Sequence, residues 1–287
     1  MKTSPHFPLV SPGSVLSTHS VMRQLVSRLS RSSAVRTTAR FFRLNRLGNA
    51  WLRTFPSIRT LPGSGIRYRA TRLESIPLAD EMFDKNVLYD PTLLPAGFTT
   101  YIDLGCNVGY FSCWLMHLAQ GRKLKGLMVD ANPTAVVEAR WHAETNGMPE
   151  IYSLNGIVGE GPEGNAAEFF VYESNICSMS KMPDTAAAGL NGKWEKISVP
   201  CLSIESQWRK HFGDLRCNVL KIDIEGSELR FLKAERTFLA LCDSVIVEWH
   251  KWEVGLPELE AVLTEVGFRH LKTIDENDSM GTAVYRR

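Results

Sequence analysis

Three short stretches of the chain carry acidic side chains of the kind that bind ligands or accept protons. Residues 101–112 read YIDLGCNVGYFS, an apolar run that reaches Asp103 and then enters a glycine turn. Residues 221–229 read KIDIEGSEL, and residues 247–253 read VEWHKWE. Carboxylates can hold a ligand or act as general bases, and histidine titrates near neutral pH. The residues therefore point to one small-ligand site built from three distant segments.

The glycine loop at residues 105–109, G-C-N-V-G, lacks the three-glycine spacing of a dinucleotide pyrophosphate site. We expect Gly105 and Gly109 to let the backbone approach a ligand without phosphates, such as S-adenosylmethionine, with Asp103 facing its ammonium group. Asp130 follows the next strand, where an acceptor for ribose hydroxyls belongs. The alternative is that Asp103 and Asp130 only cap the turns after them.

The second stretch brings charged side chains to the end of a strand. Strand alternation puts Lys221 and Asp223 on one face, with Asp223 and Glu225 at the carboxyl end, where α/β sheets bind ligands. Either carboxylate could act as a general base or hold a substrate hydroxyl, and Lys221 could lower the pKa of its neighbour. The alternative is a helix N-terminus with favourable acids at Glu225 and Glu228.

The third stretch adds a histidine. Glu248 and His250 fall at or just past the end of the next strand, adjacent to Asp223 if the strand order is the usual one. His250 could remove a proton from a substrate hydroxyl, although a lone histidine is more often structural. A divalent metal could also be held by Asp223, Glu225, Glu248 and His250. Their spacing matches no strong metal motif, and we assign no metal ligand.

Strands and helices alternate around these stretches, which predicts an open, doubly wound α/β sheet. A helix is expected from Asn132, as its N-cap, to about residue 146. A single helix is expected over residues 227–241. Residues 269–273 and 282–285 suit a final antiparallel strand pair.

Residues 173–193 read as a long polar loop that could act as a lid or contact the substrate, without a readable specificity code. His117 and His142 lie in predicted helices and are expected to be ordinary helix residues.

The charge of the 287-residue chain is strongly asymmetric, although its net charge is only +2. Residues 1–73 hold one lysine, twelve arginines and no acid, whereas the remainder holds 20 basic and 31 acidic residues. We expect a basic, partly disordered arm with short amphipathic helices at residues 1–62, and a catalytic domain at residues 63–287. The arm could be a transit-like peptide, a surface for anionic lipid or nucleic acid, or a solvated segment packed on the domain.

The six cysteines are scattered without C-x-x-C spacing, which indicates reduced thiols and a cytoplasmic protein. No apolar run approaches the roughly 20 residues of a membrane span, so we expect no transmembrane helix. The oligomeric state is left open.

Four stretches together resemble the FkbM family of S-adenosylmethionine-dependent methyltransferases, over roughly residues 101–250. They are YIDLGCNVGYFS, VDANP at residues 129–133, KIDIEGSELRFL at residues 221–232 and VIVEWH at residues 245–250. The resemblance implies a class I methyltransferase (Rossmann-like) fold with a mostly parallel sheet. It also implies O-methylation of a hydroxyl on a small molecule or sugar.

Motif and resemblance together define the expected site. The expected cofactor-binding residues are Asp103, Gly105, Cys106, Asn107, Gly109 and Asp130. The expected catalytic residues are Lys221, Asp223, Glu225 and His250. His250 and Asp223 are the leading candidates for the base. Cys106 stands where the family commonly has alanine, and Asp130 where glutamate is common.

Two other functions compete with this one. A nucleic-acid methyltransferase could use the basic arm as its binding surface, but amino-directed enzymes of that kind often carry two prolines and an aromatic residue where Ile224, Glu225 and Gly226 follow Asp223 here. A module that binds the cofactor without chemistry is the second alternative.

Overall fold

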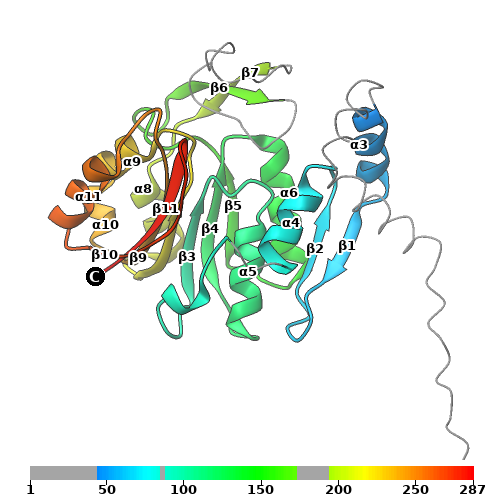
Figure 1. Cartoon of the computed structure of the whole chain (residues 1–287), viewed down its shortest axis with the longest axis horizontal. Helices are drawn as coiled ribbons and strands as arrows, with labels where there is room; N and C mark the ends of the chain where they lie inside the picture. The colour runs from blue at the N-terminus through cyan, green and yellow to red at the C-terminus, as the bar shows by residue number, and fades with distance from the viewer. Residues whose placement is uncertain (1–43, 85–87, 173–193) are drawn as a thin grey trace, which may run out of the picture.

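The computed structural model describes residues 44–84, 88–172 and 194–287. Its centre is a seven-stranded sheet in the order β10-β11-β9-β8-β3-β4-β5 (Figure 1). Five of its strands are parallel: β3 (Thr100–Leu104), β4 (Lys125–Asp130), β5 (Ile151–Asn155), β8 (Cys217–Ile222) and β9 (Cys242–His250). Two are antiparallel: β10 (Arg269–Glu276) and β11 (Met280–Arg286). This confirms the predicted doubly wound, mostly parallel sheet with an antiparallel C-terminal pair.

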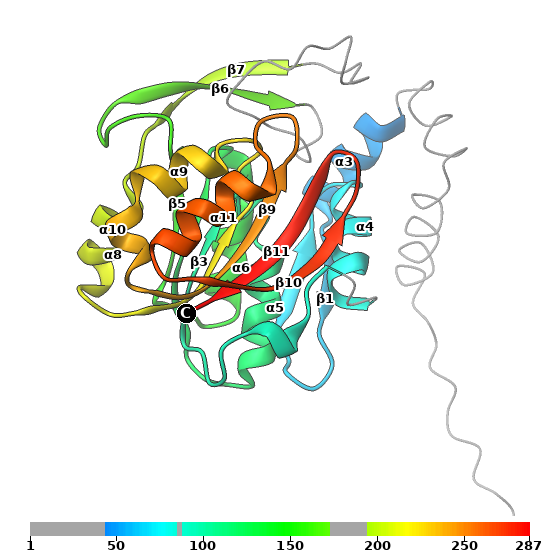
Figure 2. The same ribbon diagram turned by 60° about the vertical axis from the view of Figure 1, so that its left-hand side comes forward.

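Helices cover both faces of this sheet (Figures 1 and 2). On one face lie α5 (Tyr110–Ala119) and α6 (Pro133–Thr145). On the other lie α8 (Ile204–Phe212), α9 (Glu228–Ala234), α10 (Arg236–Leu239) and α11 (Leu256–Glu265). Successive strand residues point to opposite faces, so Tyr101 packs in the first core and Ile102 in the second. Two buried cores therefore hold the sheet from both sides.

Helix boundaries follow the local signals where those signals are strong. Asn132 caps α6, since its side chain accepts a hydrogen bond from the Thr134 backbone N–H. The single helix expected over residues 227–241 is wrong, because the backbone leaves helical geometry at Glu235 and separates α9 from α10. The Glu235 carboxylate instead accepts the backbone N–H groups of Ile204 and Glu205, at 2.7 and 3.0 Å, and so caps α8.

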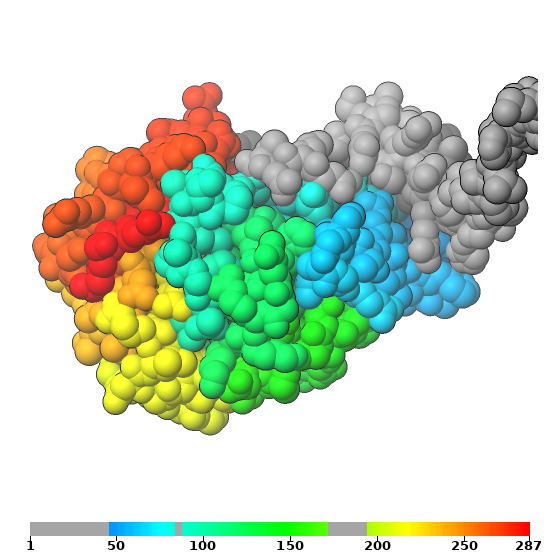
Figure 3. All heavy atoms as spheres, turned by 90° about the horizontal axis from the view of Figure 1, so that it is seen from below, coloured from blue at the N-terminus to red at the C-terminus, as the bar shows by residue number. Residues whose placement is uncertain are grey.

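The N-terminal part forms a subassembly beside α6. Its elements are α3 (Leu44–Thr54), β1 (Ser57–Thr60), β2 (Arg67–Ala70), α4 (Ser75–Ala79), the π-helical turn Asp80–Asp84 and the 3-10 turn Pro91–Leu93. β1 and β2 pair as an antiparallel hairpin, whose turn contains the boundary expected between residues 62 and 63. The described N-terminal elements (blue) and the C-terminal ones (orange and red) lie on opposite sides of the molecule (Figure 3).

A second two-stranded sheet, β6 (Ala166–Tyr172) with β7 (Trp194–Pro200), is separate from the central sheet. It lies above the carboxyl ends of the central strands in Figure 2. A parallel bridge between Ile157 and Cys201 connects its base to the segment after β5. The loop expected at residues 173–193 lies outside the described residues.

The helices and cysteines of residues 44–84, 88–172 and 194–287 bear on membrane insertion and on disulfide bonding. Among the helices of these ranges, none combines the length and the apolarity that a membrane crossing requires. The five cysteines of the same ranges are free and buried: Cys106, Cys113, Cys201, Cys217 and Cys242.

Candidate functional site

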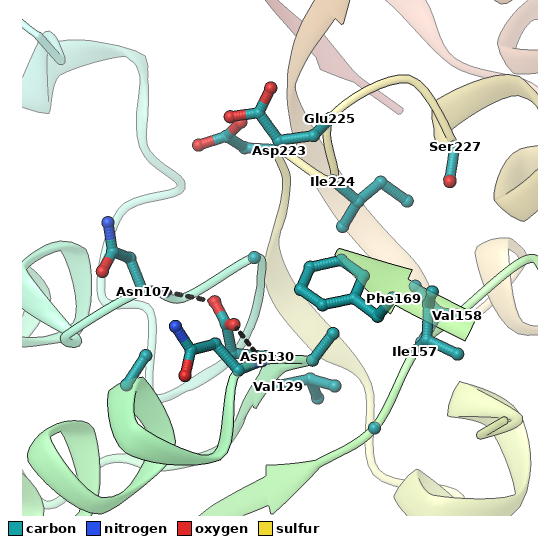
Figure 4. Close-up of a pocket in the computed structure, with 15 residues that line it drawn as sticks. Asn107, Val129, Asp130, Ile157, Val158, Phe169, Asp223, Ile224, Glu225 and Ser227 are labelled. Atoms are coloured by element: carbon teal, nitrogen blue, oxygen red, sulfur yellow. Dashed lines mark hydrogen bonds between the residues drawn. The ribbon is translucent and has the colours of Figure 1, made fainter. Parts of the chain in front are cut away.

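A cavity opens at the carboxyl ends of β3, β4 and β8, the edge where open α/β sheets bind ligands (Figure 4). Its polar wall comes from the loops after these strands. Its apolar wall comes largely from Ile157, Val158 and Phe169. Phe169 belongs to β6, so the second sheet supplies one side of the cavity.

The glycine loop approaches the neighbouring strand end very closely. Gly105 has φ of +67°, and a Cβ on it would lie 1.7 Å from the Asp223 carbonyl oxygen. Gly109 has φ of +85°, and a Cβ there would lie 3.0 Å from the Ala139 backbone of α6. Between them Asn107 also takes a left-handed conformation, with φ of +48°. The two glycines are therefore required by backbone geometry and by space.

Asp130 holds the loop at the end of β4. One carboxylate oxygen accepts the Asn107 backbone N–H and the other the Asn132 backbone N–H, both at 2.8 Å. Burial raises the pKa of Asp130 to about 6, although both hydrogen bonds favour the charged form. A carboxylate has about four acceptor positions, so two remain for ligand hydroxyls.

Lys221 lies under the loop, buried between two carboxylates. Its Nζ donates to the Gly105 carbonyl oxygen at 2.9 Å and lies 3.3 Å from Asp103 and 3.2 Å from Asp223. Burial alone would lower the pKa of Lys221, but Asp223 and Asp103 outweigh it and raise that pKa well above its usual range. Lys221 thus ties β3 to β8 at the base of the cavity.

A second polar cluster lies at the ends of β8 and β9. His250 is only 2% exposed, and its Nδ1 lies 2.9 Å from a carboxylate oxygen of the fully buried Glu228. Its Nε2 lies 3.3 Å from Glu225 and 3.8 Å from Glu248. Ligand atoms of Asp223, Glu225 and His250 all lie within 4.8 Å of one another. The sheet therefore gathers the second and third sequence stretches at one point, as their strand positions predicted.

Crowding of acids controls the protonation of this cluster. Burial first, then nearby carboxylates, raises the pKa of Glu225 to about 8 and that of Glu248 to about 7, against the opposing effect of His250. Burial would lower the pKa of His250, but its bond to Glu228 and the charge of Glu225 raise it to about 9. Near pH 7 the His250 ring is therefore charged, whereas Glu225 is mostly protonated and ionises as the pH rises through about 8.

The structure divides the expected site residues into two sets. Five of them line the cavity: Gly105, Asn107, Asp130, Asp223 and Glu225. The other five stand behind that wall and are not among its lining residues: Asp103, Cys106, Gly109, Lys221 and His250. Asp103 has no exposed surface, and its carboxylate accepts the Ser112 hydroxyl at 3.0 Å.

Sequence reasoning missed several residues of this region. Phe169 and Ile157 lack a local signal, because they reach the cavity only through the arrangement of β6 and the segment after β5. Glu228 enters the sequence analysis only in the alternative interpretation, as a favourable acid of a helix first turn, but its carboxylate lies 2.9 Å from His250 Nδ1 and orients that ring. No helical spacing links Glu228 to Glu225, because Glu225 has φ of +53° and α9 begins only at Glu228.

His142 is not an ordinary helix residue as expected. It is fully buried, and its Nε2 accepts the Arg69 backbone N–H of β2 at 3.0 Å. Its Nδ1 donates to the Val108 carbonyl oxygen at 2.8 Å, in the glycine loop. Burial lowers the pKa of His142 to about 4, so the ring is neutral and can make both bonds. His142 thus connects the N-terminal hairpin to the cavity loop.

Comparison with known proteins gives the family. The model of the methyltransferase FkbM domain matches residues 103–270, more than half of the chain. The solved FkbM methyltransferase of Methylobacillus flagellatus KT is 16% identical; the match covers 75% of this chain and 52% of that one, with a TM-score of 0.42. TrmK of M. capricolum, solved with S-adenosyl-homocysteine, is 12% identical over 69% of each chain, with a TM-score of 0.39.

No curated protein is significantly similar to the chain. The family match extends over the glycine loop, both acidic strand ends and His250. The chain belongs to the FkbM family of methyltransferases.

Proposed function

We propose that this methyltransferase binds S-adenosylmethionine in the cavity and transfers its methyl group to a hydroxyl oxygen of a small, uncharged molecule such as a sugar. One observation carries the proposal: Asp223 and Glu225 reach the cavity together, backed by His250, on a different side from Asp130 and Phe169 (Figure 4). A ligand across the cavity would have its cofactor end at Asp130 and its reacting end at the carboxylates.

The lining residues suit this cofactor. The two free acceptor positions of Asp130 match ribose hydroxyls, and Phe169 with Ile157 offers an apolar surface to the base. The backbone at Gly105 can approach the amino-acid part. Because Asp103 does not line the cavity, we assign the cofactor's ammonium to Asp223. When bound, the cofactor supplies an electrophilic methyl group on a positively charged sulfur.

Glu225 is the residue that we assign to the hydroxyl proton. It lines the cavity, whereas His250 lies behind it. Its pKa of about 8 is close to neutral pH, which suits a general base. His250 Nε2, 3.3 Å away, holds the Glu225 carboxylate, and Glu228 holds the imidazole. In this arrangement His250 positions the base.

The charge of the region favours an uncharged acceptor over a nucleic acid. Five carboxylates surround the reacting end, namely those of Asp103, Asp223, Glu225, Glu228 and Glu248. A pKa of about 8 leaves Glu225 mostly protonated near pH 7. Lys221 and His250 still balance only part of the remaining negative charge, so a phosphodiester backbone would be repelled here. Trp252 is exposed, with its ring 4.5 Å from that of His250, and could receive the apolar face of a sugar.

The test is transfer of labelled methyl groups from S-adenosylmethionine to a fractionated cell extract, followed by identification of the product. Glu225→Gln should lower kcat about 100-fold or more, the usual contribution of a general base. Its affinity for S-adenosylhomocysteine should stay within about threefold of wild type, because the base does not hold the cofactor. Wild-type kcat should rise between pH 7 and 9 as Glu225 ionises, and this rise should be absent in the variant.

Glu265→Gln, on the exposed surface of α11, is the matched control and should leave kcat unchanged. Full activity in Glu225→Gln would remove Glu225 as the base. Label in a nuclease-sensitive fraction would contradict the acceptor class. Cofactor binding without transfer to any fraction would contradict the chemistry.

A further inference from the structure

The outer face of α3 is an exposed apolar stripe on an otherwise basic part of the chain. Leu47, Trp51 and Phe55 lie at i, i+4 and i+8 and are 68%, 37% and 53% exposed. They are three of the seven exposed large apolar side chains among the described residues. The rings of Trp51 and Phe55 lie 5.8 Å apart, so the side chains form one patch.

The helix that carries this stripe is firmly attached to the domain by its other side. Leu52 is buried against Ala70 and Ile76. The Asn49 side chain accepts the Leu73 backbone N–H at 2.8 Å. The stripe is therefore held in place on the domain, and α3 lies at one end of the β1–β2 hairpin, at the edge of the described part of the molecule (Figure 1).

Positive charge accompanies the stripe. Arg46 and Arg53 are exposed on α3 itself, and the first 73 residues contain thirteen basic residues and no acid. The rest of the chain has a net charge of −11. An anionic surface would thus attract Arg46, Arg53 and the basic segment to which α3 belongs, and would repel the acidic remainder of the chain.

We propose that α3 docks the enzyme on an anionic phospholipid surface, with Leu47, Trp51 and Phe55 entering the interface and arginines at the headgroups. A helix with Leu, Trp and Phe on one face and arginine beside them is the pattern of interfacial helices. RNA would offer no apolar phase to Leu47. A second copy of the chain would bring two strongly basic segments together. This proposal is independent of the acceptor and of the methyl-transfer chemistry.

The test is flotation of the whole 287-residue chain with phosphatidylcholine vesicles that contain or lack phosphatidylserine. Wild type should float with the phosphatidylserine vesicles and lose binding as salt rises. Leu47→Glu should lower the partition coefficient about tenfold or more, since a leucine leaves the interface. Arg53→Glu should lower it about fivefold or more, from the loss of attraction per charge.

Leu271→Glu and Arg269→Glu, both exposed on β10 at the far side of the molecule, are the matched controls and should bind within about twofold of wild type. Circular dichroism checks that all four variants are folded. Equal binding to both vesicle types, or unchanged binding in Leu47→Glu and Arg53→Glu, would overturn the proposal. So would Leu47-dependent binding to an RNA oligonucleotide, or a Leu47-dependent dimer without lipid.

Discussion

At the scale of single residues, the cavity depends on a backbone contact that only glycine allows. A side chain on Gly105 would meet the Asp223 carbonyl, so the loops after β3 and β8 would have to separate. We expect Gly105→Ala to abolish binding of S-adenosylhomocysteine in calorimetry and to destabilise the fold by more than the cost of left-handed geometry, about 1–2 kcal/mol.

Gly121→Ala separates the cost of left-handed backbone geometry from the effect of the close approach between the two loops. Gly121 has φ of +86°, but a Cβ there would have no neighbour within 4 Å. This variant should lose about 1–2 kcal/mol of stability and keep its cofactor affinity. Equal loss of binding in both variants would show that strain in the backbone, and not the close approach, is responsible.

Asp130 should make cofactor affinity depend on pH. Because its pKa is raised to about 6, the carboxyl becomes neutral below that pH and accepts hydroxyl hydrogen bonds less well. Calorimetry should show affinity for S-adenosylhomocysteine falling from pH 7 to pH 5. Asp130→Asn should bind S-adenosylhomocysteine about tenfold more weakly at pH 7. Its amide has one oxygen and one NH2 group, so it can accept the N–H of Asn107 or of Asn132 but not both in the present geometry. The same pH slope in that variant would contradict this role.

At the scale of elements, His142 joins three of them through its two ring nitrogens. His142→Ala would leave the Arg69 N–H and the Val108 carbonyl without their partner, at about 1–3 kcal/mol for each buried group. We expect a lower melting temperature and weaker cofactor binding, because Val108 belongs to the glycine loop.

His117→Ala is the control for this prediction. The His117 ring is hydrogen-bonded to the Ser64 hydroxyl at 2.7 Å, and the residue is only half-buried. The His117→Ala variant should lose clearly less stability than His142→Ala and should keep its cofactor affinity. Similar losses in both variants would argue against a specific connection between β2 and the loop.

At the scale of the whole molecule, the acid cluster should make the ligand-free protein less stable at high pH. Glu248, Glu225 and His250 have pKa values raised to about 7, 8 and 9. A group whose pKa is raised on folding stabilises the fold at low pH and loses that contribution as pH rises through the folded value. His142 acts oppositely, since its lowered pKa of about 4 favours folding above pH 6.5.

Above pH 6.5 His142 is neutral in both states and no longer offsets the cluster, so melting temperature should fall from pH 6.5 to pH 9. Glu225→Gln should reduce this fall, and Glu265→Gln should not change it. A wild-type melting temperature that does not vary between pH 6.5 and 9 would contradict the raised pKa values of Glu225, Glu248 and His250.

The expectations that succeeded depend on local signals. A strand that passes into a glycine loop at residues 101–109, and the Asn132 cap before a proline, are readable because the determining residues are neighbours in the chain. The convergence of Asp223 and His250 was also predictable, since parallel strands end at the same edge of the sheet.

What the sequence by itself determined is the alternation of elements, the loop geometry and the family to which these motifs belong. Only the tertiary structure decided that Asp103 and Lys221 lie beneath the cavity, that Phe169 forms its wall, and that Glu235 ends one helix to cap another. The physical reason is the same in each case. Burial and hydrogen-bond partners come from segments far apart in the chain, and no local pattern specifies which of them meet.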